Sequence, residues 1–317
     1  MTAVPRFLFL CTIGLCSLLS YNAVRMPVLA LFAESLGAGP ALIGLVVAAS
    51  TLTGVALKLP AGALSDIYGR HRIMRLALIA FGVPPFLYPF VTDVEVLIGL
   101  RFVHGLATAL FAPSALAMVA EMFPAHRGAS LGWYTASTQA GALLGPVLGG
   151  WLVYFAGFPQ TFVAGGLIGC VGLLLFFALG LNRADAPTRR SELTSVWSEF
   201  MSGLRSAVRN APVVVTSLAD AAKMIANGAL MAFLPLYGLS VGLNSGEVGL
   251  LFGAQALTSF VSKPVMGRVS DRIGRPPLIL FGLVLCAGTF VLIPHVTAWP
   301  VLLILSAGFG FGEAVVS

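Results

Sequence analysis

Long apolar runs alternate with short polar turns along almost the whole chain. A helix that crosses a membrane needs about 20 mainly apolar residues, and ten runs approach or exceed that length. Their approximate limits are 7–30, 41–63, 74–92, 95–119, 129–154, 160–181, 212–239, 246–266, 278–295 and 299–317. The pattern therefore predicts an all-α membrane protein with ten transmembrane helices.

One connection between these runs, residues 182–210, is long and polar. Within it apolar residues recur at helical spacing, and Arg205 and Arg209 lie near its end. The apolar positions are Leu193, Val196, Trp197, Phe200, Met201, Leu204 and Val208. This periodicity predicts an amphipathic helix on the membrane surface. We expect it to link a six-helix bundle over 1–181 to a second bundle over 211–317, as a tether or, alternatively, as a regulatory element.

The composition and the charge pattern fit a membrane protein. Of the 317 residues, 58% are hydrophobic and 9% are charged, whereas soluble domains carry about 25% charged residues. The net charge of +6 comes from basic clusters between the apolar runs, which argues against nucleic acid binding. Alternate connections (33–40, 92–95, 155–160, 240–246 and 295–298) contain no Lys or Arg. The positive-inside rule then predicts a cytoplasmic N-terminus, in a multi-pass protein of a bacterial inner membrane.

A polar turn with the pattern G-x-x-S-D-x-x-G-R occurs twice, and its two aspartates, Asp66 and Asp271, are 205 residues apart. Each copy ends an apolar run, and identities at the same offset continue through the neighbouring runs. Spans 1–4 therefore correspond to spans 7–10. Two halves with the same orientation predict a binding site between the halves.

The first copy of the turn contains residues that can form ion pairs. Gly69 allows a tight turn, and Asp66 and Arg70 are placed to pair with each other or with Glu121. We interpret this set as a latch that holds the outward-facing state, with a simple charge anchor as the alternative. The complete predicted gating set is Gly62, Asp66, Gly69, Arg70, Arg72, Glu121, Gly267, Asp271, Gly274 and Arg275.

Ionisable residues inside the predicted spans are costly in lipid and usually face a cavity or a partner. Arg101 and His104 share one helix face, and we expect both to point into the space between the halves. His104 is a candidate proton-transfer group or, alternatively, a hydrogen-bonded packing residue. Asp220 and Lys223 are expected to pair. Glu313 has no basic residue near it in the sequence, which makes it the first candidate for a proton carrier, with Asp220 second.

Small residues recur every four positions in the fifth span, at Gly141, Gly145 and Gly149. Such a face allows close approach of a neighbouring helix, and Pro146 can bend the span. Together with Gly150, these residues predict a bend at the interface between the halves, with ordinary small-residue packing as the alternative.

The remaining polar positions add little chemistry. Asn22 and Arg25, near the end of the first span, are expected to line an outer vestibule. The four cysteines lie in apolar runs and are interpreted as packing residues. The sequence contains no nucleotide-binding loop, metal-ligand cluster or nucleophile–base pair, so we expect no cofactor, no metal and no enzymatic activity.

Three motifs resemble those of the major facilitator superfamily, in order and over essentially the whole chain. The repeated turn resembles its cytoplasmic loop motif, although Ile67 replaces a usual basic residue. The stretch Leu97-x-x-x-Arg101-x-x-His104-Gly105 resembles a second motif of the family, with His104 where Gln is usual. The stretch Gly141-x-x-x-Gly145-Pro146-x-x-Gly149-Gly150 resembles a third motif, which is typical of the drug/proton antiporter branch. The resemblance implies a twelve-span transporter, so we expect two further spans beyond Ser317, with a natural ten-span protein as the alternative.

These features together predict a monomeric secondary transporter in the lipid bilayer. We expect proton-coupled efflux of small amphipathic molecules by alternating access. A proton-coupled importer of a small organic acid or metabolite is one alternative. A membrane sensor that binds a ligand without transporting it is the other.

Overall fold

The computed structural model describes residues 3–178, 180 and 193–316, and every regular element in these residues is a helix. The elements are α1 (Ala3–Arg25), α2 (Val28–Ser35), α3 (Pro40–Tyr68), α4 (Arg70–Gly82), η1 (Pro84–Phe90), α5 (Val94–Met122), η2 (Pro124–His126), α6 (Arg127–Ala156), α7 (Phe158–Ala178), α8 (Leu193–Arg209), α9 (Ala211–Ser240), α10 (Ser245–Ile273), α11 (Arg275–Leu292), η3 (Ile293–His295) and α12 (Trp299–Val316). The predicted all-α fold class is confirmed.

Nine stretches of the described residues are helical, long and apolar enough to cross a membrane. The first of them, Pro5–Ser35, covers most of α1 and all of α2, which are separated only by Met26 and Pro27. The eighth predicted span, 246–266, falls within α10 (Ser245–Ile273), which has 29 residues but is not among these nine stretches. The predicted number of ten spans is therefore approximate.

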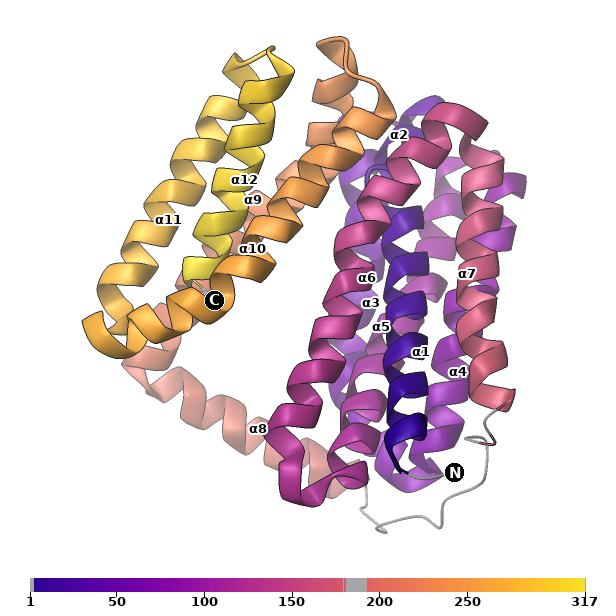
Figure 1. Cartoon of the computed structure of the whole chain (residues 1–317), viewed down its shortest axis with the longest axis vertical. Coiled ribbons are helices and arrows are strands. Elements are labelled where there is room, and N and C mark those ends of the chain that lie inside the picture. The colour runs from indigo at the N-terminus through magenta and orange to yellow at the C-terminus, as the bar shows by residue number, and fades with distance from the viewer. Residues whose placement is uncertain (1–2, 179, 181–192, 317) are drawn as a thin grey trace.

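The helices form two groups (Figure 1). Helices α1–α7 make the first half, α9–α12 make the second half, and α8 runs between the two groups at one end of the molecule. We call this end, where α1 also begins, the α8 end. The first part of the predicted linker, 182–192, lies outside the described residues, as do the side chains of Leu193, Val196, Trp197 and Phe200.

The internal repeat is visible in the turns. Gly69, between α3 and α4, and Gly274, between α10 and α11, both have φ of 91°. At the opposite end, Gly37 and Gly242 occupy equivalent positions in the repeat and also have positive φ. Residues other than glycine rarely adopt a positive φ. Glycine at these four positions therefore lets each half make the same sharp turns.

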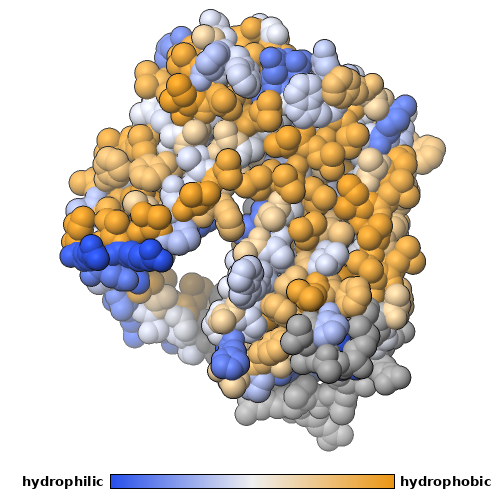
Figure 2. Space-filling view, viewed as in Figure 1, coloured by the Kyte–Doolittle hydropathy of each residue, from blue (hydrophilic) through white to orange (hydrophobic). Residues whose placement is uncertain are grey.

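Each half has its own apolar core. The first half contains two buried clusters, around Phe81 and around Phe162, and the second half contains one around Phe309. Met26, at the break between α1 and α2, packs against the cluster of the second half. Figure 2 shows apolar side chains over the middle of the molecule and a hollow between the halves near the α8 end.

Candidate functional site

The two halves contact each other through α6 and α10. Ser245 Oγ donates a hydrogen bond of 3.0 Å to the carbonyl oxygen of Gly150. A Cβ atom on Gly249 would lie 2.5 Å from the carbonyl oxygen of Pro146, and one on Gly253 would lie 2.5 Å from Val147 Cγ2. Since neither contact leaves room for a methyl group, glycine is what allows these two helices to meet.

This contact is away from the α8 end of the molecule. Ser245 begins α10 at the opposite end, and α6 reaches Gly150 six residues before its end there. Toward the α8 end, the space-filling view shows the hollow between the halves (Figure 2). The halves are therefore joined toward the end of the molecule opposite α8 and separated toward the α8 end.

The predicted small-residue face of α6 does not lie at this contact between the halves. A Cβ atom on Gly145 would lie 2.5 Å from Asn22 Cβ, and Cβ atoms on Gly141 and Gly149 would overlap backbone atoms of α1. These three glycines pack α6 against α1 within the first half. The sequence prediction of a glycine face at the interface between halves is therefore wrong for them, and of the set only Pro146 and Gly150 touch the second half.

Arg101 and His104 were expected to face the space between the halves, and that prediction is wrong. Both side chains are fully buried inside the first half. Arg101 Nε donates to the carbonyl oxygen of Val46 at 3.4 Å, and its Nη2 donates to Ser50 Oγ. The alternative interpretation of His104 holds, because its Nδ1 and Tyr88 Oη form a hydrogen bond of 2.8 Å.

Two arginines lie close to a buried tyrosine, Tyr21, that the sequence analysis did not single out. The guanidinium carbons of Arg25 and Arg101 each lie 5.7 Å from the centre of the Tyr21 ring. The ring of His104 contacts the same tyrosine edge-on at 4.9 Å. Arg25 lies four residues after Tyr21, which is the one signal of this contact in the sequence. Cation–π contacts of this kind stabilise charge in an apolar setting.

Arg25 and Asn22 were expected to line an outer vestibule. Arg25 Nη2 donates to Thr51 Oγ1 at 3.1 Å, which ties the end of α1 to α3. Asn22 is buried, and its Nδ2 donates to the carbonyl oxygen of Leu18 at 2.8 Å. The vestibule prediction is therefore wrong for Asn22, whose amide is used within its own helix.

Charged side chains of the second half gather on α9 and α12. Lys223 Nζ lies 2.6 Å from Asp220 Oδ1, which confirms the predicted pair, and the lysine side chain is 2% exposed against 57% for the aspartate. Glu313 was expected to have no partner, and that expectation is wrong. Glu313 and Lys223 both lie close enough to Cys286 for their charges to act on its thiol. We refer to Asp220, Lys223 and Glu313, two carboxyl groups and one ammonium group, as the charged cluster of the second half.

The first repeated turn contains the predicted ion pairs. Arg70 Nη2 lies 3.4 Å from Asp66 Oδ1, and Arg70 Nη1 pairs with Glu121 Oε1. Arg72, two residues after Arg70, is exposed. The three paired residues belong to α3, α4 and α5, all in the first half, and they are paired while the hollow lies open at the same end. The ion pairs therefore do not by themselves hold the two halves together.

The second repeated turn differs from the first. Asp271 and Arg275 are exposed, and neither forms an ion pair within the described part of the chain. The leading glycines of the two copies, Gly62 and Gly267, have open space where a Cβ atom would lie. The backbone conformation thus requires glycine only at Gly69 and Gly274.

Among the described residues, no three His, Cys, Asp or Glu side chains come together as metal ligands.

Comparison with known protein sequences places these features in a family. The family model described as Major Facilitator Superfamily matches residues 10–317. The chain is 28% identical over 295 residues to a multi-drug resistance efflux pump PmrA homolog of Lactococcus lactis, covering 88% of this chain and 70% of that protein. It is 28% identical over 280 residues to the multidrug resistance protein MdtG of Klebsiella pneumoniae, covering 85% and 66%. An uncharacterized MFS-type transporter of Methanocaldococcus jannaschii is 23% identical over 272 residues, covering 84% and 69%.

Solved structures share the fold. A bacterial homolog of the human lysosomal transporter Spinster, in an inward-facing and unoccupied conformation, superposes with a TM-score of 0.77 at 15% identity, covering 99% of this chain and 74% of that one. The nucleoside transporter NupG superposes with a TM-score of 0.80 at 12% identity, covering 97% and 80%. At such identities the likeness concerns the fold alone.

Proposed function

This chain belongs to the Major Facilitator Superfamily of transporters, and from that membership we propose that it exports small amphipathic molecules in exchange for protons. The export direction rests on the relatives named as multidrug efflux pumps. Substrate binds between the halves near the middle of the membrane, and alternating access comes from rocking one half against the other. The protein is integral to the membrane, and we propose that its α8 end faces the cytoplasm.

One observation carries this proposal: the halves are joined through Gly150 and Ser245 on one side of the midplane and separated on the other side. A transporter that alternates needs such a one-sided contact, because the contact closes the path on that side while the other side admits substrate. With the α8 end cytoplasmic, the arrangement corresponds to a state open to the cytoplasm. That is the state in which an exporter takes up its substrate.

We assign proton coupling to the charged cluster of the second half. Asp220, Lys223 and Glu313 carry one excess negative charge when all three are ionised, so uptake of one proton neutralises the set. A neutral set is cheaper to move into contact with the apolar first half than a charged one. One proton that moves inward across 100 mV supplies about 2.3 kcal/mol, which is enough to drive substrate accumulation.

The experiment that tests this function measures flux in inside-out vesicles that contain the protein. A lipophilic dye is added outside while the vesicle interior is acidic. An exporter accumulates the dye inside and releases protons as it does so, and a protonophore abolishes both. Dye movement in the same direction as protons would indicate an importer instead, and dye binding without flux would indicate a sensor.

A further inference from the structure

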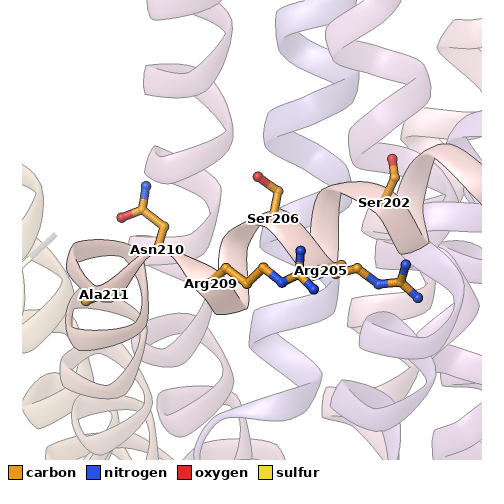
Figure 3. Close-up of a pocket in the computed structure, with 6 residues that line it drawn as sticks. All are labelled: Ser202, Arg205, Ser206, Arg209, Asn210 and Ala211. Atoms are coloured by element: carbon orange, nitrogen blue, oxygen red, sulfur yellow. The ribbon is translucent and has the colours of Figure 1, made fainter.

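We propose that α8 and the start of α9 form a binding site for the phosphate group of an anionic phospholipid. The site is an open pocket of about 580 Å³ at the junction of the two helices (Figure 3). Its lining residues are Ser202, Arg205, Ser206, Arg209, Asn210 and Ala211. The proposal goes beyond the transport function and does not depend on the substrate or on its direction of movement.

The order of side chains around α8 places this pocket at the level of lipid headgroups. Met201, Leu204 and Val208 are exposed and form an apolar stripe. At about 100° per residue, Arg205 and Arg209 come next to this stripe, and the serines follow on the far side of the arginines. A helix that lies in the membrane interface with its apolar stripe toward the acyl chains holds such flanking arginines among the phosphates.

The arginines are available for an anion. Within the described residues neither Arg205 nor Arg209 forms an ion pair, and no acidic residue lines the pocket. Their side chains leave α8 on the same side and run in the same direction (Figure 3). Two guanidinium groups four residues apart on one helix can donate to the same phosphate, with which guanidinium forms strong, often bidentate hydrogen bonds.

Two neighbouring polar side chains can donate further hydrogen bonds to the phosphate. Ser206 and Asn210 follow one another at a step of four and point to one side of α8 (Figure 3). Asn210 also precedes the first residue of α9, and its side chain does not cap that helix. The N–H groups of Ala211 and Val213 at the start of α9 carry partial positive charge, and the last carbonyl groups of α8 at the same junction offset it. The attraction for a phosphate therefore comes mainly from the two arginines.

A phospholipid fits this pocket better than a free phosphate because of the apolar stripe beside it. The apolar stripe can pack against acyl chains, while the arginines can donate hydrogen bonds to the phosphate of the headgroup. Anionic lipids concentrate near basic residues at the cytoplasmic surface. A lipid held here would fix the start of α9, the first span of the second half, at a constant depth while the halves move.

The test measures lipid adducts on the purified protein by native mass spectrometry. The protein in detergent is mixed with equal amounts of phosphatidylglycerol and phosphatidylcholine. We expect one phosphatidylglycerol to be retained preferentially. The double variant Arg205→Gln, Arg209→Gln should lower this preference about 25-fold, since each basic residue at an anionic surface is worth about a fivefold gain.

The matched control is Arg268→Gln, Arg272→Gln on α10. These two arginines are also exposed and also four residues apart, but they lie outside the pocket, so this variant should keep the preference. An equal loss in both double variants would overturn the proposal, because net charge alone would then explain the binding. Displacement of phosphatidylglycerol by inorganic phosphate would likewise overturn it, because the ligand would then be a free anion.

Discussion

The hydroxyl group of Ser245 donates a hydrogen bond of 3.0 Å to the carbonyl oxygen of Gly150, and this bond links the two halves of the protein. Beside it, the backbone of Gly249 lies against Pro146. Small residues on both helices allow this approach. We regard the contact of α6 and α10 as the pivot about which the halves rock, and the first prediction tests it.

Replacement of Gly150 by leucine should abolish transport, because the new side chain would overlap the backbone of α10 at Ser245 and Gly249. Overpacking of this kind costs about 1–3 kcal/mol, and here the halves can relieve it by separating. We therefore expect flux to fall to background while each half stays folded, as measured by dye uptake and circular dichroism. Gly132→Leu is the control, because no atom lies within 4 Å of its Cβ position.

Gly145 should behave differently from Gly150, although both belong to the same motif. Its Cβ position lies 2.5 Å from Asn22 Cβ, inside the first half. Gly145→Leu should therefore lower the melting temperature of the protein in detergent, in addition to impairing transport. Equal melting temperatures for the two variants would contradict the assignment of Gly145 to packing within one half.

The ion pair of Arg70 with Glu121 should stabilise the turn between α3 and α4, but only modestly because Glu121 is half-exposed. A double-mutant cycle with Arg70→Gln and Glu121→Gln should give a coupling of about 0.5–1 kcal/mol, measured by thermal unfolding. Arg275→Gln, at the equivalent place in the repeat, has no ion pair to lose among the described residues and should leave the melting temperature unchanged. A coupling near zero would argue for a simple charge anchor.

Loss of Asp220 should weaken the charged cluster of the second half. Lys223 is almost fully buried and lies 2.6 Å from this carboxylate, so Asp220→Asn should lower the free energy of unfolding by about 1–3 kcal/mol. This is less than for a fully buried pair, because the aspartate is half-exposed. The variant should also lose proton release during dye uptake. Asp271→Asn serves as control, because this aspartate is exposed and forms no ion pair in the part of the chain that the structure describes. Equal proton release in both variants would refute the assignment.

His104 should not take part in proton transfer. It is fully buried in the first half and bonded to Tyr88, away from the second half. We expect His104→Gln, which keeps a polar partner for Tyr88, to show the same pH dependence of transport as the unmodified protein. Tyr88→Phe should cost about 1 kcal/mol of stability for the lost hydrogen bond. A shifted pH profile in His104→Gln would show that the imidazole titrates during transport.

The sequence predicted the features that depend on local pattern. Apolar runs indicate the helices, and the duplicated turn indicates the equivalence of Gly69 with Gly274, which share a φ of 91°. Ion pairs within one helix turn, such as Asp220 with Lys223, also follow from spacing alone.

What could not be predicted is the direction in which a helix face points. Periodicity shows that Arg101 and His104 share a face, yet only the packing of α1 and α3 around them decides that this face is internal to one half. The same holds for Gly145, whose partner is α1 and not α10. The proximity of residues far apart in the chain, such as Glu313 and Cys286, leaves no spacing signal at all.

The measurement that most directly tests rocking about the contact of α6 and α10 is a pair of spin-label distances in the reconstituted protein. One pair of labels, at Trp133 and Val265, spans the halves toward the α8 end; the other, at Tyr154 and Leu239, spans them at the opposite end. On addition of dye and a change from alkaline to acidic buffer, the account predicts that one distance shortens while the other lengthens. Two distances that stay constant, or that change in the same direction, would contradict it.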